Sequence, residues 1–390
     1  MKHLKQVTNS IVLLASLCPV VGCAPETNEA LEVGEVQQAL GSTKPRVDIS
    51  TWNQLVAMAS DGNYRLTADI NASGKTWVAK PFTGTFDGNG KTISNLTINN
   101  NSTSGLFESL YQAIVKNVKL TNLTASGWMV GGLAGYAEES QVERVVVEGT
   151  ITAVNYGFAA GGIFGEMIGG SLYRSYAKGT VQSAHFYSGG LAGFVGVGAS
   201  TRGVITQSYA QVTVIADTSN TGAASYAGGL VGYSSDGDIH DVYAVGNVTG
   251  RGGVGGLVGH LGCGSWNAWL LYKGIYRGNV VDQDAPAGGW AGTIGAYEQC
   301  TARFANLFWD RTLDTSTNWV SNSEADLAQY RGTSTQLRSP TGVKSGIYCM
   351  PDVVPGRCGD NNFETTVWDA GTSTQHHALL NMPGPNAQPR

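Results

Sequence analysis

A five-residue block recurs along the middle of this 390-residue chain and limits the folds available to it. The block reads Gly-Gly-Leu-x-Gly or a close variant, and its copies begin at positions 131, 161, 189, 228, 255 and 288. Successive copies start 30, 28, 39, 27 and 33 residues apart, and periods of this size are typical of solenoids. A partial copy, Ser104-Gly105-Leu106-Phe107, marks the expected start of the array.

A second element repeats between the blocks and predicts β-strands. Alternating sequences rich in β-branched and aromatic residues occupy 143–149, 174–179, 207–212 and 241–246. No stretch of useful length has a helical period, which excludes ankyrin, TPR and HEAT arrays. A propeller blade needs four strands in about 40 residues, so 27–33 residues fit one turn of a parallel β-helix better. We expect Gly-Gly to allow positive φ at a corner while the following Leu or Ile enters the core.

The composition is compatible with a large folded core. Glycine accounts for 54 residues, and 14% of residues are charged against about 25% in an average protein. Hydrophobic residues make up 42% of the chain, which disfavours disorder. A net charge of −5 argues against a nucleic-acid partner, because such proteins carry a basic face.

The N-terminus predicts export. Residues 1–22 combine a basic start at Lys2 and Lys5 with an apolar run and small residues, as in a signal peptide. Val20-Val21-Gly22-Cys23 resembles the lipobox of bacterial lipoproteins, in which the cysteine is lipidated; ordinary signal cleavage nearby is the alternative. Residues 23–47 would form an acidic tether. By resemblance to enteric lipoproteins, Ala24 after the cysteine suggests the outer membrane, and surface exposure stays open.

Four further cysteines predict two disulfides. They are Cys263, Cys300, Cys349 and Cys358, an even number in an exported chain. Of the three possible pairings we favour Cys263–Cys300 and Cys349–Cys358. A zinc site is the rival interpretation, but no CxxC or nearby histidine supports it.

The blocks, together with the interleaved Ser-Tyr-Ala-x-Gly sequences, resemble the GLUG motif. This motif is found in bacterial surface and adhesin-like proteins and beside the peptidase part of some streptococcal IgA proteases. The resemblance covers roughly residues 48–381 and implies an all-β, right-handed parallel β-helix over 48–311. We expect a short helix at 51–59 to cap one end, and an irregular disulfide-containing C-terminal cap and tail over 312–390.

Catalytic motifs are scarce. The sequence contains no HExxH and no GxSxG, so neither a zinc peptidase nor a nucleophile-elbow hydrolase is indicated. A polysaccharide lyase or hydrolase would need carboxylates stacked across coils, and no such column persists. We expect no cofactor and no metal, with Asp236 and Asp238 as weak calcium candidates. The carboxylates considered for lyase or hydrolase chemistry are Glu138, Glu139, Glu166, Asp236, Asp238 and Asp241.

An aromatic residue recurs once per coil in the strand regions. If the neighbouring Ala177, Ala210 and Ala244 point inward, these aromatic residues point outward. Stacked rings stabilise a sheet, which is one interpretation; the other is an exposed strip that holds sugar rings or a partner protein. The predicted strip consists of Tyr176, Tyr209, Tyr243, Tyr276 and Phe308, with a one-residue gap allowed near Tyr276.

Export, tether, repeats and the missing catalytic set together favour a non-catalytic function. The sequence predicts a surface protein, attached to the membrane only through its lipid anchor, that adheres to a polysaccharide or to a partner surface. The alternatives are a β-helix polysaccharide lyase or hydrolase and a passive structural spacer. The oligomeric state cannot be read from these features.

Overall fold

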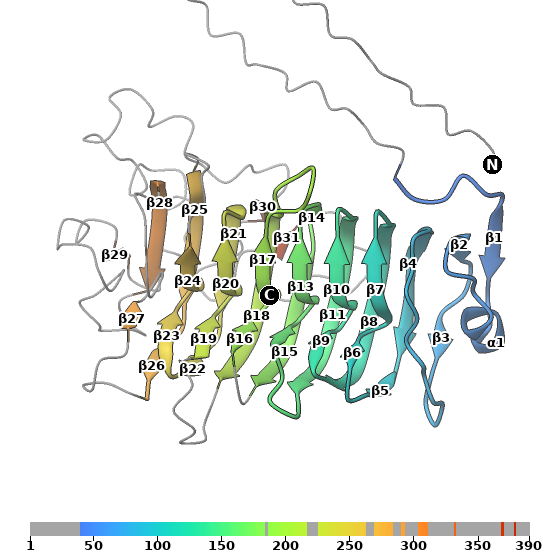
Figure 1. Cartoon of the computed structure of the whole chain (residues 1–390), viewed down its shortest axis with the longest axis horizontal. Helices are drawn as coiled ribbons and strands as arrows, with labels where there is room; N and C mark the ends of the chain where they lie inside the picture. The colour runs from blue at the N-terminus through green and yellow to red at the C-terminus, as the bar shows by residue number, and fades with distance from the viewer. Residues whose placement is uncertain are drawn as a thin grey trace, which may run out of the picture. The chain divides into compact units, whose positions relative to one another are not determined.

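The computed structural model describes residues 40–183, 186–216, 225–262, 269–283, 290–292, 303–310, 331–332, 368–369 and 378–379. These residues form an all-β solenoid in which strands from successive turns pair in parallel. The strands of each sheet lie side by side in sequence order (Figure 1). The predicted parallel β-helix is therefore confirmed. Its right-handed sense stays a prediction.

Three parallel sheets form the walls of the solenoid. Sheet A contains the long strands, and its pairing begins at β1 and runs to β29. Its strands are β1 (Arg46–Ile49), β2 (Asn63–Leu66), β3 (Ile70–Asn71), β4 (Thr85–Ser94), β5 (Thr97–Asn99), β8 (Ile114–Gly127), β11 (Gln141–Ala153), β14 (Ser171–Tyr173), β15 (Tyr176–Ser183), β18 (Val204–Ala216), β21 (Asp238–Val245), β22 (Val248–Gly250), β25 (Trp269–Arg277), β26 (Val280–Asp282), β28 (Arg303–Asp310) and β29 (Arg331–Gly332).

Sheets B and C contain shorter strands on either side of the glycine blocks. Sheet B consists of β7 (Phe107–Tyr111), β10 (Ala134–Glu138), β13 (Phe164–Ile168), β17 (Ala192–Gly196), β20 (Val231–Ser235) and β24 (Val258–Gly262). Sheet C consists of β6 (Thr103–Ser104), β9 (Met129–Gly131), β12 (Ala159–Gly161), β16 (Tyr187–Gly189), β19 (Ser225–Gly228), β23 (Gly252–Gly255) and β27 (Trp290–Gly292). Each turn passes from sheet C through the block into sheet B and then into sheet A.

The blocks stack in register from coil to coil. The first glycines of the first five blocks pair directly with one another across sheet C. The weak sixth block departs from the predicted spacing, because Gly255 pairs with Gly292 and not with Gly288. In the last strand of sheet C, the third glycine of the block, Gly292, therefore takes the position that the first glycine occupies in the other coils.

The block glycines serve close packing and not positive φ. Positive φ values occur at several glycines of the described chain, but at none in the first five blocks. A Cβ on Gly132 would lie 2.6 Å from the carbonyl oxygen of Gly162 on the next coil, and Gly162 and Gly190 have the same kind of neighbour. The expectation of a positive-φ corner at Gly-Gly is thus wrong, because the neighbouring backbone excludes a side chain there. The residue after each glycine pair is fully buried, as expected; the set is Leu133, Ile163, Leu191, Leu230 and Leu257.

Positive φ is instead found at a bend within sheet A. The bend residues of successive coils are Asn117, Arg144, Arg174, Gln207 and Asp241. Asparagine adopts this left-handed conformation more readily than most residues, and side-chain bonds support the others. The Arg144 Nε donates to Asn117 Oδ1 at 2.8 Å, and the Arg174 Nε donates to Gln207 Oε1 at 3.0 Å.

A short helix lies between β1 and β2. Helix α1 (Trp52–Val56) begins at a capping box: the Thr51 hydroxyl accepts from the Gln54 N–H, while the Gln54 side chain accepts from the Thr51 N–H. Leu55 is fully buried, and the ring of Trp52 packs edge-on against Trp77 at 5.6 Å. The helix predicted over 51–59 is therefore present but shorter, because its last residues leave the helical path.

Several predicted features lie outside the described residues. They include the signal, the tether up to residue 39, Cys23, Cys263, Cys300, Cys349, Cys358 and most of the expected C-terminal cap. Within that cap region the structure describes β29, which extends sheet A beyond residue 311, and an antiparallel pair of β30 (Trp368–Asp369) and β31 (Ala378–Leu379). Among the residues described, no helix has the length and hydropathy to cross a membrane.

Candidate functional site

The predicted tyrosine strip on sheet A is a buried stack. Tyr176, Tyr209 and Tyr243 pair in register, with ring centroids 4.7 and 4.6 Å apart and interplanar angles of 13° and 6°. The alanines beside them point inward as predicted; a Cβ on Gly162 would meet the side chain of Ala177. However, the three tyrosines are at most 3% exposed. The prediction of an exposed binding strip is wrong for these residues, and their packing supports the stabilising interpretation.

The strip also ends earlier than predicted. Tyr243 pairs with Ile275, whereas Tyr276 pairs with Ala244 and is fully buried. No one-residue gap occurs, so Tyr276 belongs to the alanine column, where its hydroxyl donates to the Gly246 carbonyl at 3.1 Å. Phe308 pairs with Ile275 through the backbone of β28, and its side chain lies outside the described set.

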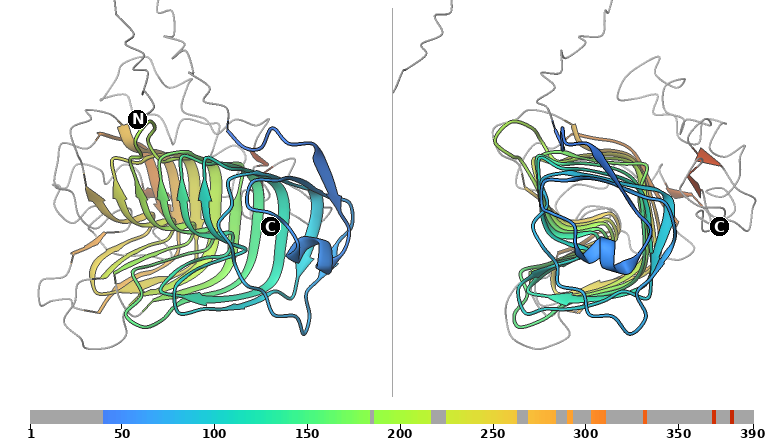
Figure 2. Two further views of the ribbon diagram at one scale, coloured as in Figure 1. Left: turned by 45° about the vertical axis from the view of Figure 1, so that its right-hand side comes forward. Right: turned by 90° about the vertical axis from the view of Figure 1, so that its right-hand side faces the viewer.

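A different set of rings lines the outer surface where sheets B and C face each other. We call this set the aromatic seam. Its members are the residues one position after the blocks in sheet B, Tyr136, Glu166, Phe194, Tyr233 and His260, and the residues two positions before the blocks in sheet C, Met129, Ala159, Tyr187 and Tyr226. Viewed along the coils, the ribbon bends inward between these two sheets (Figure 2, right).

Rings contact one another both along and across the seam. Along sheet B, Tyr233 stacks on Phe194 at 5.3 Å and on His260 at 4.6 Å. Across the seam, Tyr187 lies 5.5 Å from Phe194 and 5.2 Å from Tyr233, while Tyr226 lies 4.7 Å from His260. The five tyrosine and phenylalanine rings of the seam are only partly buried and are not part of the hydrophobic core. The seam therefore presents aromatic surface to solvent.

The third glycine of each block brings the two sheets together. A Cβ on Gly193 would lie 2.8 Å from the Ala160 nitrogen, and a Cβ on Gly232 would lie 2.5 Å from the Ser188 nitrogen. Sheet B thus approaches the sheet C backbone more closely than any side chain allows. The side chains that follow these glycines emerge at the mouth of this contact, which explains why rings from two sheets meet.

Two carboxylates lie in or beside the seam on neighbouring strands. Glu166 is in register with Tyr136 on one side and Phe194 on the other, and burial raises its pKa. Glu138 Oε2 accepts from the Tyr136 hydroxyl at 2.8 Å. Burial, followed by that bond and the charge of Glu138, raises the pKa of Tyr136. Burial also lowers the pKa of His260 to about 4, so this ring is neutral at physiological pH.

Further aromatic residues extend the seam outward from sheet C. Phe158 stacks on Trp128 at 5.4 Å and contacts Tyr187 edge-on at 5.2 Å. Phe186 lies 6.1 Å from Phe158. Trp128 and Phe186 are 39% and 41% exposed, unusual values for such large apolar side chains. The aromatic surface is therefore wider than the seam itself.

The remaining carboxylate candidates have structural surroundings. Glu139 accepts bonds from the Ser200 N–H at 2.7 Å and from the N–H and hydroxyl of Thr201, and so fastens the loop after β17. Burial raises its pKa, but these three bonds outweigh burial and leave it lowered. Asp236 is buried at a positive-φ corner, and Asp238 starts β21. No group of three metal-ligating side chains occurs in the described part of the chain, and the calcium suggestion stays a prediction.

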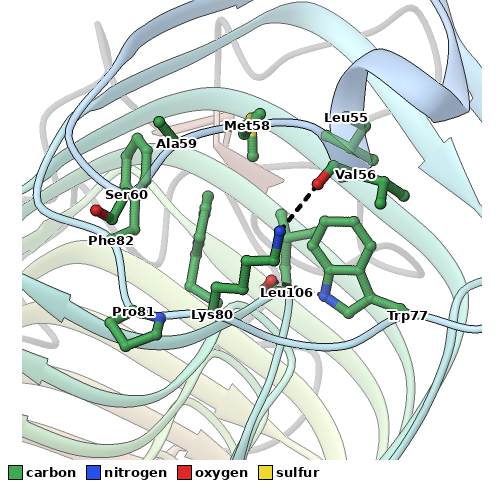
Figure 3. A pocket seen from close by; sticks show the side chains of 11 residues that line it. Leu55, Val56, Met58, Ala59, Ser60, Trp77, Lys80, Pro81, Phe82 and Leu106 are labelled. Atoms are coloured by element: carbon green, nitrogen blue, oxygen red, sulfur yellow. Dashed lines mark hydrogen bonds between the residues drawn. The ribbon is translucent and has the colours of Figure 1, made fainter.

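A small pocket lies beside α1, away from the seam (Figure 3). Its lining is mainly apolar and includes Leu55, Trp77 and Phe82. The Lys80 ammonium crosses it and donates to the Val56 carbonyl at 3.0 Å, while the Trp77 indole donates to the Leu106 carbonyl at 2.8 Å. The Lys80 bond ties α1 to the segment before β4, and the Trp77 bond ties that segment to the next coil, so the pocket belongs to the packing around the helix.

The sequence contained a signal for the seam that the strip prediction missed. The position directly after the third glycine reads Tyr136, Glu166, Phe194, Tyr233 and His260 in the first five blocks. Four of these five side chains are aromatic rings, at the period of the blocks themselves. Anchoring the search for periodic aromatics on the blocks, and not on the intervening strands, would have found them.

Comparisons with known proteins agree with this architecture. Residues 126–152 and 223–249 match the family model of the GLUG motif, and each segment covers one turn of the solenoid. A stretch of 127 residues is 35% identical to halomucin from Haloquadratum walsbyi, covering 27% of this chain and 1% of halomucin. The predicted resemblance to GLUG-motif proteins is confirmed.

Two solved structures share the fold. An IgA1 protease aligns with a TM-score of 0.51 and 21% identity, over 70% of this chain and 21% of the protease. A putative immunoglobulin A1 protease from Bacteroides ovatus aligns with a TM-score of 0.52 and 18% identity, over 85% of this chain and 91% of that protein. At these identities the likeness concerns the fold alone. The chain spans only a small part of halomucin and of the first protease.

Proposed function

We propose that this GLUG-motif solenoid is an exported, surface-associated protein that binds an extended polysaccharide along the aromatic seam without cleaving it. The observation that carries the proposal is the column from Tyr136 to His260, in which the rings of Tyr136, Phe194 and Tyr233 are partly exposed, Glu166 replaces a ring and His260 is buried. Four coil spacings of about 4.8 Å give the row a length of about 19 Å, enough for several consecutive sugar units. Aromatic rings with a polar end are favoured at such binding surfaces.

Retention by a polysaccharide gel tests the seam. The full chain would be run by affinity electrophoresis through gels containing soluble polysaccharides, with Tyr233→Ala and Tyr187→Ala as seam variants. Tyr173→Ala is the matched control, because Tyr173 is a partly buried tyrosine of sheet A that carries Arg174 at 5.0 Å from its ring. We expect the seam variants to lose retention while the control keeps it. Equal retention of all three would contradict the proposal.

Export and anchoring form a separate part of the proposal. The signal-like residues 1–22 and Cys23 support a lipid anchor in the cell envelope, at the outer membrane or the cell surface. In a bacterial host, incorporation of a labelled fatty acid should disappear in Cys23→Ser and persist in Cys18→Ser. Labelling of both variants would exclude Cys23 as the acylated residue.

A polysaccharide lyase or hydrolase is the second candidate, favoured by Glu138 and Glu166. Their Cα atoms lie one strand and two residues apart, which corresponds to about 8 Å in a sheet. Side chains on the same face at that Cα separation can bring their carboxyl groups within the roughly 5–9.5 Å that paired glycosidic carboxylates require. Release of reducing ends by the full chain, abolished in Glu166→Gln, would establish this candidate. A protein that neither binds nor cleaves any polysaccharide would be left as a structural spacer.

The ends of the solenoid complete the proposal. Right-handed winding is supported by the strong general preference of parallel crossovers for that hand. We further propose that α1 caps one end of the coils, and that Cys263–Cys300 and Cys349–Cys358 stabilise a C-terminal cap. Mass spectrometry of the unreduced, proteolysed chain would show whether these two pairs occur.

A further inference from the structure

We propose that the aromatic seam selects uncharged sugar chains over uronate-type polyanions, with Glu166 as the hydrogen-bond acceptor that determines this specificity. The inference rests on the proposed binding function and adds the ligand class to it. It is carried by the charge of the seam, by the surroundings of Glu166 and by the absence of any partner for this carboxylate among the described residues.

The side chains of the seam carry no positive charge to receive an anion. The two columns of the seam, and the sheet B column two residues further along each strand (Glu138, Ile168, Gly196, Ser235 and Gly262), contain Glu138, Glu166 and His260 as acidic or basic groups. None of their described residues is Lys or Arg. His260 is neutral because burial lowers its pKa to about 4. A polyanion placed along the seam would therefore meet rings, carboxylates and small or apolar side chains, and no cation among the described residues of these columns.

Glu166 lies at the place where a ligand on the seam would need a hydrogen-bonding group. It stands in register between Tyr136 and Phe194, and its charge also acts on Tyr187 from the facing sheet. No described residue donates a hydrogen bond to its carboxylate, although the side chain is partly buried. Carboxylates in such positions ordinarily have partners, so Glu166 has its full accepting capacity available for a ligand.

The chemistry of this arrangement distinguishes two kinds of sugar chain. Hydroxyl groups of an uncharged sugar can donate to Glu166 while the apolar faces of the sugar ring lie on Phe194 or Tyr136. A uronate in the same place would bring a second carboxylate against Glu166 in a poorly solvated setting, where like charges repel strongly. The same surface thus favours one class and disfavours the other.

Pairs of polymers that differ only in charge test the inference. The probes are uncharged hydroxyethyl and anionic carboxymethyl derivatives of a β-glucan, a mannan and a galactan, used in affinity electrophoresis with the full chain. We expect the wild-type protein to be retained by at least one uncharged polymer and at least about tenfold more weakly by its carboxymethyl partner. Tenfold corresponds to about 1.4 kcal/mol of binding free energy.

Variants at position 166 assign the discrimination to Glu166. Glu166→Gln keeps the shape and one acceptor oxygen but removes the charge, so it should reduce the preference for the uncharged polymer to less than about threefold. Glu166→Ala should weaken retention by the uncharged polymer itself. Glu143→Gln is the control, since Glu143 lies on sheet A and pairs with Arg144 at 3.0 Å.

The outcomes separate this inference from the proposed function. Stronger retention by the carboxymethyl polymers, or unchanged discrimination in Glu166→Gln, overturns the inference while leaving polysaccharide binding intact. Failure of every polymer to retain the wild-type chain overturns both. If the chain were retained by a deglycosylated protein and by no polysaccharide, the seam would be a peptide-binding surface. That result would also overturn both the inference and the proposed function.

Discussion

The molecule contains two rows of stacked rings that differ in exposure and not in stacking. On sheet A, Tyr209 lies between Tyr176 and Tyr243 at 4.7 and 4.6 Å; in the seam, Tyr233 lies between Phe194 and His260 at 5.3 and 4.6 Å. Coil spacing produces both rows, so ring stacking alone does not indicate a site. Tyr209 is fully buried, whereas Tyr233 remains partly exposed. Exposure therefore supports a stabilising role for the first row and is consistent with the binding role proposed for the second.

Alanine substitutions in the two rows should separate these effects most strongly. Tyr209→Ala removes a fully buried ring and should lower the free energy of unfolding by about 3–5 kcal/mol. Tyr233→Ala removes a partly exposed ring and should cost about 1–2 kcal/mol. Urea unfolding of both variants, followed by circular dichroism, measures the difference.

The loss of polysaccharide binding should be larger for the variant that loses less stability. At temperatures where both variants are folded, Tyr209→Ala should be retained by polysaccharide gels like the wild-type chain, and Tyr233→Ala should not. If the two substitutions cost equal stability, or if Tyr209→Ala alone lost retention, the distinction between the rows would be wrong.

A glycine between the two rows provides a smaller test. A Cβ on Gly190 would meet the carbonyl oxygen of Gly229 and would lie 2.6 Å from the Cβ of Ala210, the neighbour of Tyr209. Gly190→Ala should therefore destabilise the protein by about 1–3 kcal/mol through overpacking. Thermal unfolding of the variant checks this value.

The double variant Gly190→Ala/Ala210→Gly shows which neighbour matters. It removes the contact with the Ala210 side chain but leaves the contact with the backbone carbonyl. We expect little recovery of stability, because the carbonyl belongs to the hydrogen-bonded coil. Full recovery would mean that side-chain crowding, and not coil-to-coil backbone contact, makes the block glycines necessary.

The repeat period predicts the solenoid because each turn must pair with the next. The buried Leu133 and Leu191 follow from the same period, since a residue that recurs once per coil stacks on its own copies. The function of the block glycines did not follow. Whether Gly190 is required for positive φ or for contact with Gly229 depends on the path of a neighbouring coil, which no local pattern contains.

The seam was harder to predict for a related reason. Alternation correctly places Ala177 inward and hence Tyr176 on the opposite face, but it cannot say whether that face is covered. The meeting of Tyr187 with Tyr233 requires knowledge of how sheets B and C approach across the block. Burial and the facing of two sheets are properties of the folded chain, so the site could be predicted only as a periodic set of rings.

A pH titration should also distinguish the two rows, and it is the test with the smallest expected effect. His260 in the seam has a pKa lowered to about 4 from 6.5 by burial against Tyr226 and Tyr233, whereas burial raises the pKa of Tyr176 and Tyr209 in the sheet A row. Of the two rows, only the seam therefore contains a ring that titrates between pH 7 and 4.

The folded state favours neutral His260, so its contribution to stability is fully present above pH 6.5 and is lost as the pH falls toward 4. We expect the wild-type chain to lose about 1–2 kcal/mol more than His260→Gln between pH 7 and pH 4.5, measured by urea unfolding at each pH. Carboxylates such as Glu139 titrate in both proteins, so their effect cancels in the difference. Parallel stability curves for the two proteins would show that His260 is hydrated in the folded chain, and would remove the evidence that this end of the seam excludes water.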